Sequence, residues 1–297
     1  MKNKGWIIFW ITLLSILVVA LVIGLIFLLD GKKNFFGLHF DFGYRVSQNL
    51  IMDEMYETDF NTISIDTSAA DISISETQDS YVRVVVYGDK ERLHMEDRNQ
   101  TLTIDYQEKK CKGLCLKRTI GKVEVYVPSN YSQDIIVHNQ YGDVSIGEFR
   151  EANLEIIENC GEVKIDGAKK IAVTNDYGDI ELGNAEIATI KQSCGDIYVD
   201  TVKEMDAENK FGDIEIRRVL GYLNIEEDCG DIHIDHVNLE RSSTIKNNLG
   251  DIEIGSTNEI YIDAKTSLGD VDIRNNYRKS EVILTIKNDC GDIEVDN

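Results

Sequence analysis

The sequence predicts an all-β protein: a single-stranded parallel β-solenoid of about nine or more coils, preceded by one N-terminal transmembrane helix. Three observations carry this prediction. A short phrase recurs with a nearly constant period, apolar residues alternate inside each phrase, and 22 glycines stand against one proline. Many short strands joined by glycine-containing turns have this composition.

The N-terminal segment predicts the helix. Residues 6–29 carry no charge, and at about 1.5 Å per residue they reach roughly 36 Å, enough to cross a bilayer. Neither a small-x-small cleavage site nor a lipoprotein cysteine follows, which favours an uncleaved anchor. Asp30 and the short leading tail favour a single-pass protein of the cell membrane, with residues 1–5 cytoplasmic and residues 30–297 extracytoplasmic.

Residues 30–57 form a juxtamembrane segment. Its aromatic stretch, residues 34–44, suits either the outer headgroup level or a first buried strand. Beyond residue 33 the chain carries 27 basic and 52 acidic residues, a formal charge of −25. Such a domain repels nucleic acid and anionic lipid, and it attracts cations, cationic peptides and basic protein surfaces.

The phrase Gly-Asp-Ile-x-Ile recurs through residues 136–297 at intervals of 17 to 22 residues. Its glycines, expected to form structural turns, are Gly142, Gly161, Gly178, Gly195, Gly212, Gly230, Gly250, Gly269 and Gly291. A period of this length that persists nine times is typical of a solenoid with one coil per repeat.

Within each phrase, apolar residues such as Ile180 and Leu182 alternate with polar ones, so their side chains are predicted to point inward. The residue before each glycine is also apolar or a cysteine, as at Tyr177 and Cys194, and is predicted to enter the core. Parallel coils lie about 4.8 Å apart, so equivalent residues form columns along the solenoid.

The two ends of the solenoid differ in sequence. Residues 58–135 lack the phrase but contain alternating strands, interpreted as degenerate first coils and hairpins that cap the N-terminal end. The chain stops directly after the ninth phrase, which predicts an uncapped C-terminal coil with an exposed strand edge. Either Asp292, Glu294 and Asp296 keep this edge solitary, or the edge docks a partner or a second copy.

This combination of an N-terminal anchor and repeated Gly-Asp-Ile-x-Ile coils resembles the bacterial DUF4097 family of β-strand-repeat proteins, which are described as adhesin-like. The resemblance covers most of residues 58–297. It implies a β-solenoid at the cell envelope, with some members linked to envelope-stress responses. The shared phrase is architectural and transfers no catalytic residue.

The acidic residue after each glycine forms one column along the solenoid. Its members are Asp143, Glu162, Asp179, Asp196, Asp213, Asp231, Asp251, Asp270 and Asp292. Two interpretations stay open. Calcium could relieve the repulsion between stacked carboxylates, with Asp179, Asp196, Asp213 and Asp231 as ligands. Alternatively, each carboxylate accepts hydrogen bonds from turn amides and no cofactor is needed.

The six cysteines fall into two groups. Four share the position before glycine and are interpreted as buried apolar fillers: Cys160, Cys194, Cys229 and Cys290. The others, Cys111 and Cys115, frame a lysine-rich loop, where they either close a hairpin-tip disulfide or stay free. This basic loop is either solvated or in contact with anionic wall polymer or lipid headgroups.

His233 and His236 lie beside Asp231 and Asp235, a set that suits metal binding or acid–base chemistry but is also ordinary on a solvated strand. No cluster departs from the repeat as a polysaccharide-active enzyme would require. The sequence therefore favours a membrane-anchored, non-enzymatic interaction or scaffold module of the cell envelope, adhesin-like, whose partner is an envelope protein, a cell-wall polymer or a cationic peptide. The alternatives are an envelope-stress sensor, a protein that sequesters cations or cationic peptides, and an enzyme.

Overall fold

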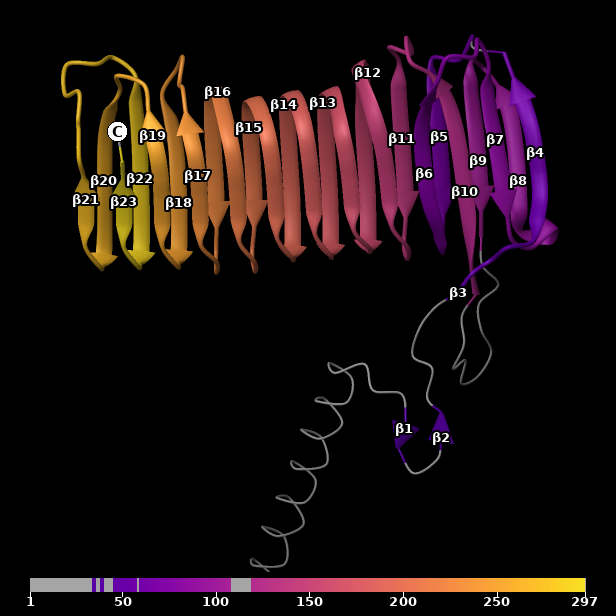
Figure 1. Cartoon of the computed structure of the whole chain (residues 1–297), viewed down its shortest axis with the longest axis horizontal. Coiled ribbons are helices and arrows are strands. Elements are labelled where there is room, and N and C mark those ends of the chain that lie inside the picture. Colours follow the sequence, from indigo (N-terminus) through magenta and orange to yellow (C-terminus); the bar gives the residue numbers. More distant parts are fainter. Residues whose placement is uncertain (1–33, 36–37, 40–44, 58, 108–118, 297) are drawn as a thin grey trace, which may run out of the picture. The chain divides into compact units, whose positions relative to one another are not determined.

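The computed structural model describes residues 34–35, 38–39, 45–57, 59–107 and 119–296. The chain divides into two units. In the smaller one, β1 (Asn34–Phe35) and β2 (Leu38–His39) form an antiparallel pair. The larger one, within residues 46–110 and 119–297, is the solenoid (Figure 1).

The predicted transmembrane span, residues 6–29, lies outside the described residues, as do Cys111 and Cys115. Within the described ranges, no helix is long and apolar enough to cross a membrane. The helical segment found there is the short 3-10 turn η1 (Lys90–Arg92).

The remaining strands are short at both ends of the solenoid and long in its middle. In chain order they are β3 (Arg45–Val46), β4 (Leu50–Tyr56), β5 (Thr62–Thr67), β6 (Ala70–Thr77), β7 (Val82–Tyr87), β8 (Leu93–Arg98), β9 (Thr101–Tyr106), β10 (Thr119–Pro128), β11 (Asp134–Asn139), β12 (Val144–Cys160), β13 (Val163–Tyr177), β14 (Ile180–Cys194), β15 (Ile197–Asn209), β16 (Ile214–Glu227), β17 (Ile232–Val237), β18 (Ser243–Leu249), β19 (Ile252–Thr257), β20 (Tyr261–Leu268), β21 (Val271–Ile273), β22 (Ile283–Cys290) and β23 (Ile293–Val295).

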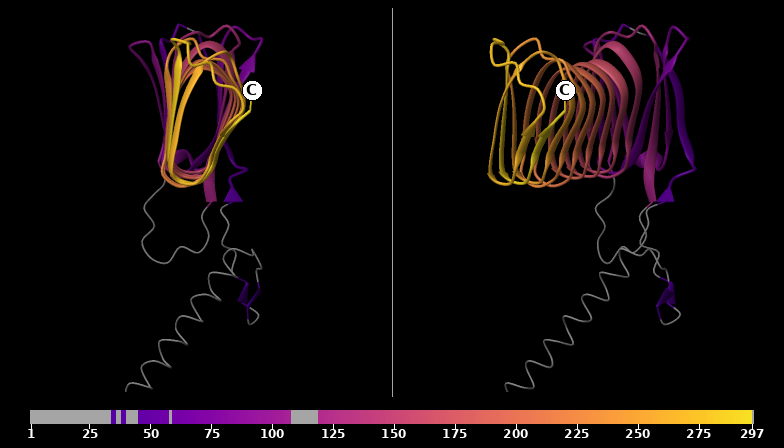
Figure 2. Two further views of the ribbon diagram at one scale, coloured as in Figure 1. Left: turned by 90° about the vertical axis from the view of Figure 1, so that its left-hand side faces the viewer. Right: turned by 60° about the vertical axis from the view of Figure 1, so that its left-hand side comes forward.

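Each long strand supplies two faces of a flattened coil. The residues after a Gly-Asp phrase form the first face, and the chain then bends into the second face, which leads to the next glycine (Figure 2). Equivalent residues stack in parallel register: Ile180 lies on Ile197, which lies on Ile214. The predicted parallel stacking of coils is thus confirmed.

The core lies between the two faces. Ile180 and Leu182 of the first face are buried, as are Ala188 and Ile190 of the second. Each strand alternates inward apolar and outward polar residues, as the sequence predicted. Because the coils stack in register, the inward side chains join into one continuous hydrophobic core.

At the N-terminal end, spatial order differs from chain order. The coil β5–β6 lies between β9–β10 on one side and β11–β12 on the other. Its second strand begins with Ala70 in the place of the phrase glycine, followed by Asp71 and Ile72. Antiparallel strands follow outside this coil: β8 pairs with β9, β7 with β10, and β4 with β7.

The C-terminal end repeats this departure from chain order, and it corrects one prediction. The last coil, β22–β23, pairs with β18–β19 on one side and with β20–β21 on the other (Figure 1). Both edges of the final strand therefore have partners. The prediction of an uncapped C-terminal coil is wrong, because the outermost coil is β20–β21, which precedes it in sequence.

Candidate interaction surface at the glycine–aspartate corner

The phrase glycines form a tight corner between the second face of one coil and the first face of the next. Gly178 has φ 126°, a left-handed backbone that favours glycine. A Cβ at this position would lie 2.2 Å from the carbonyl oxygen of Gly161 in the adjacent coil. The corner therefore needs glycine both for its backbone angle and for the close approach of neighbouring coils.

The carboxylates after the glycines bind backbone amides. At seven of these positions, and at Asp71 in the first coil, Oδ1 of an aspartate accepts the backbone N–H of the equivalent residue in the adjacent coil, at 2.8 to 3.2 Å. Asp196 Oδ1, for example, accepts from Asp213 at 2.8 Å. The hydrogen bonds from turn amides that one interpretation predicted are thus present at seven of the nine positions.

The calcium alternative involved Asp179, Asp196, Asp213 and Asp231, which occupy successive coils of this column. Among the described residues, no group of three or more His, Cys, Asp or Glu side chains is arranged to hold a metal ion. Calcium binding by this column stays a prediction. We refer to the nine residues after the phrase glycines as the acidic column.

The residues before the phrase glycines lie outside, not in the core, so that prediction is wrong. We call these nine residues the outer ridge. Its large members are exposed: Tyr141 by 45%, Tyr177 by 61%, Phe211 by 58%, Leu249 by 52% and Leu268 by 71%. Its four cysteines are free; Cys194 is exposed, and Cys160, Cys229 and Cys290 are half-buried. They are not buried core fillers.

Large residues and cysteines alternate along the whole outer ridge. In spatial order it reads Tyr141, Cys160, Tyr177, Cys194, Phe211, Cys229, Leu249, Cys290, Leu268. In chain order the alternation fails, because Leu268 follows Leu249. In space the alternation is regular, because β22 lies between β18 and β20. Large side chains therefore recur every second coil, roughly 9.6 Å apart, with a smaller thiol between them.

A second column, which we call the inner column, lies inside the same corner, three residues before the glycines. Its members are Asn139, Glu158, Asn175, Gln192, Asn209, Glu227, Asn247 and Asn288, and all are buried. The Nδ2 group of Asn175 donates to the carbonyl oxygens of Gly161 at 3.1 Å and Gly178 at 3.0 Å. Sequence reasoning missed this column, although an amide or Glu three residues before glycine was its signal.

Two members of the inner column are carboxylic acids. Oε1 of Glu158 accepts the backbone N–H groups of Asn159 at 3.1 Å and Cys160 at 3.0 Å, while Oε2 is buried without a partner. Burial raises the pKa of Glu158 to about 7, against the lowering effect of these hydrogen bonds. Burial likewise raises the pKa of Glu227 to about 7. In its protonated form, Oε2 carries an O–H that can donate a hydrogen bond.

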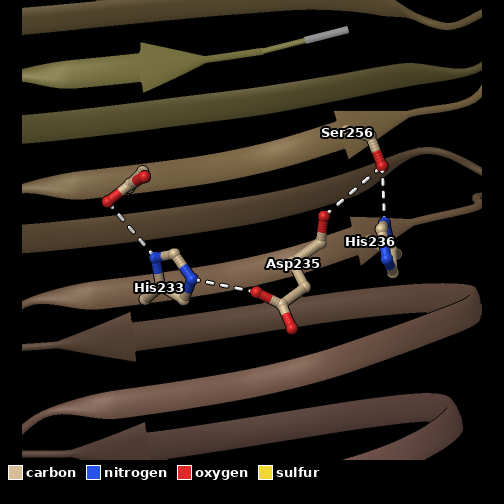
Figure 3. A network of polar contacts seen from close by, with 5 residues as sticks. His233, Asp235, His236 and Ser256 are labelled. Carbon is tan, nitrogen blue, oxygen red and sulfur yellow. Dashed lines mark hydrogen bonds and ion pairs between the residues drawn. The ribbon is translucent and has the colours of Figure 1, made fainter.

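The histidine cluster forms ordinary surface contacts (Figure 3). His233 Nε2 lies 3.0 Å from Asp235 Oδ1, and its Nδ1 lies 3.3 Å from Glu253 Oε2. His236 Nδ1 lies 2.7 Å from Ser256 Oγ. Burial lowers the pKa of His233, but its two carboxylate partners outweigh burial and raise it overall. Ser256 Oγ also donates to the carbonyl oxygen of Asp235 at 3.4 Å, so Ser256 and Asp235 link the two imidazoles in one surface network (Figure 3).

A shallow hollow lies on the first face, beside Gly183 and Tyr198. Asp200 on its wall pairs with Arg217, which lowers the pKa of Asp200. This pairing neutralises the one cation in the lining of the hollow. Three further carboxylates, Asp166, Glu181 and Glu215, also line the hollow.

Comparison with solved structures finds distant similarity. A candidate adhesin from Bacteroides fragilis is 18% identical, with a TM-score of 0.44, over 85% of this chain and all of its own. A candidate adhesin from Parabacteroides merdae is 12% identical, with a TM-score of 0.39, over 85% of this chain and 98% of its own. A candidate lipid-binding protein from Parabacteroides distasonis is 12% identical, with a TM-score of 0.36, over 85% and 100%.

Similarity at these TM-scores does not bear on function. No curated protein has a significant match to the sequence. The family comparison is stronger, because residues 60–297, which include the parallel coils and their glycine–aspartate corners, match the Toastrack DUF4097 family. The chain belongs to the Toastrack DUF4097 family.

Proposed function

We propose that the protein is a non-enzymatic interaction module of the bacterial cell envelope, adhesin-like, that binds a partner along the outer ridge. In this proposal residues 6–29 anchor the chain in the cytoplasmic membrane, residues 1–5 are cytoplasmic, and residues 30–297 are extracytoplasmic. The observation that carries the proposal is the outer ridge itself: five large apolar side chains in one column, each 45% exposed or more.

Exposure of such a column calls for a function. Isolated apolar residues on a surface are ordinary, but a contiguous apolar stripe usually marks a binding surface. The nine positions of the outer ridge extend over roughly 40 Å at about 4.8 Å per coil. The acidic column runs beside the ridge, two residues further along each coil. A partner that matches both columns has apolar groups flanked by basic ones.

The test is retention of the detergent-solubilised full chain on isolated cell wall, lipid vesicles and envelope extract, at low and high salt, with and without calcium. The double variant Tyr177→Ser/Phe211→Ser removes the centre of the ridge. Ile187→Ser/Tyr198→Ser is the matched control, because these residues are 36% and 39% exposed but lie off the ridge. Loss of retention in the ridge variant alone supports the proposal, and equal retention of both variants contradicts it.

A second candidate function is capture of cationic amphipathic peptides near the membrane. The pairing of an apolar ridge with an acidic column favours it, because such a peptide carries both complementary features. Peptide binding should then fall steeply with added salt, since exposed charges are screened. Binding that is unaffected by salt, or that survives Tyr177→Ser/Phe211→Ser, would argue against this function.

A further inference from the structure

The two ends of the solenoid finish in strands of different direction. At the N-terminal end, β4, β7 and β8 run antiparallel to the neighbouring strands and lie outside the first parallel coil. At the other end, among the described strands, β20 pairs with β22 alone and β21 with β23 alone. The outer edges of β20 and β21 therefore carry backbone groups that a further strand can pair with.

A side-chain clasp covers only the beginning of this edge. Asn276 Oδ1 accepts the N–H of Ile262 at 3.0 Å, and its Nδ2 donates to the Ile262 carbonyl oxygen at 2.8 Å. Backbone groups that face outward alternate with those that face β22, so Ala264 and Thr266 follow Ile262 on the outer side. Beyond the clasp, no described strand pairs with this side of β20.

Charge and exposure also distinguish this end. Residues 258–282 contain four basic residues (Lys265, Arg274, Arg278, Lys279) and five acidic ones (Glu259, Asp263, Asp270, Asp272, Glu281), so the segment is nearly neutral on a strongly acidic protein. Leu268 is 71% exposed and Val271 is 42% exposed here. A second copy of the chain can thus approach this end with little of the repulsion that opposes contact elsewhere.

We propose that the β20–β21 end pairs with the same end of a second copy, with β20 antiparallel to β20 and β21 antiparallel to β21. A twofold axis perpendicular to the two faces produces this arrangement and keeps each face continuous across the junction. At the opposite end the outermost described strands, β4 and β8, run antiparallel to their neighbours, so head-to-tail stacking does not continue the parallel register of the coils. Because the twofold contact uses the same end of both copies, association through it closes at a dimer and does not continue into a fibre.

The dimer is tested with the full chain in detergent, mixed from light and 15N-labelled protein and cross-linked through lysines. Expected are mixed-isotope links that join Lys265 or Lys279 of one copy to the same residues of the other, together with a dimer in sedimentation velocity. A monomer at every concentration, or intermolecular links confined to other lysines, overturns the proposal. If the N-terminal segment holds the dimer, the intermolecular links will join other lysines, and this result also overturns the proposal.

Two variants sharpen the test. Ala264→Pro removes an outward N–H from the edge, which an edge strand tolerates, and should weaken dimerisation at least tenfold. Arg278→Glu/Lys279→Glu makes the end acidic and should also weaken it, whereas Lys170→Glu/Lys203→Glu makes the same charge change in the middle of the solenoid and should not. Unchanged circular dichroism and unchanged ridge binding show that each variant is folded. If dimerisation is unaffected in folded Ala264→Pro, β20 pairing is refuted.

Discussion

The inner column and the outer ridge repeat within three residues of the same glycine, yet they reverse the usual rule of polar outside and apolar inside. Asn175 is buried, whereas Tyr177, two residues later, is 61% exposed. The buried amide is explained by the corner, because its Nδ2 satisfies two glycine carbonyls. The exposed ring has no comparable structural task. The inner column is therefore explained by stability, whereas the outer ridge is explained by the binding role proposed above.

The largest expected effect is on the pH dependence of the inner column. Glu158 and Glu227 have pKa values of about 7 in the folded protein, against 4.5 for the ordinary side chain. Between these values the folded state retains protons that the unfolded state has released, so rising pH favours unfolding. Each glutamate should lower the free energy of unfolding by roughly 3 kcal/mol across this window, with no further loss above it.

Urea denaturation at about pH 5 and about pH 8 measures this loss, and Glu158→Gln/Glu227→Gln should remove most of it. Glu162→Gln/Glu215→Gln is the control, since both of these side chains are exposed and outside the inner column. An equally steep pH dependence in the inner-column variant would show that the two glutamates are not protonated in the folded state.

A smaller effect is expected from loss of a single amide. Asn175→Ala leaves the carbonyl oxygens of Gly161 and Gly178 without this donor and opens a small cavity. The free energy of unfolding should fall by roughly 2 to 3 kcal/mol. Thermal or urea unfolding measures the change. A loss below about 0.5 kcal/mol, the usual effect of a surface substitution, would mean that water replaces the amide at no cost.

The outer ridge should contribute far less to stability. Tyr177→Ser replaces an exposed ring, so the free energy of unfolding should change by no more than about 0.5 kcal/mol. The same urea titration compares it with Asn175→Ala, two residues away. If the two variants were equally destabilised, the ridge would belong to the folding core of the corner and its assignment to binding would fail.

The last expected effect concerns the chemical reactivity of the outer-ridge cysteines, with the smallest change in stability. Thiols on the outer ridge should react with a small alkylating agent in the folded protein, with Cys194 first because it is exposed while the other three are half-buried. Mass spectrometry of the native protein after timed alkylation measures the order. If all four thiols stayed unreacted until denaturant was added, the cysteines would lie in the interior and not on the surface.

Much of the fold follows from local sequence, and the exceptions have identifiable causes. Period-two alternation correctly placed Ile180 and Leu182, since strands are regular on both faces. It failed at Tyr177, because the chain turns at Gly178 and the two preceding residues, Asp176 and Tyr177, both point outward. Extrapolating the strand period through the corner therefore placed the outer ridge in the core.

Chain order at the two ends was beyond local reasoning. β22 pairs with both β18 and β20. The sequence around β22 does not predict this, because strand order depends on competition between distant, similar phrases. Two cues did exist. Ala70-Asp71-Ile72 is the phrase with alanine for glycine, and the alternation of large residues with cysteines is regular only when Cys290 is placed between Leu249 and Leu268.

The inserted coil at the C-terminal end has a kinetic consequence. A solenoid wound strictly in chain order would place β20–β21 directly on β18–β19, the site that β22–β23 occupies in the native protein. The two coils carry the same phrase, so each offers that edge similar backbone pairing. We expect the final stage of folding to include a slow exchange whenever the earlier coil occupies the edge first, because the wrong pairing must open before the correct one forms.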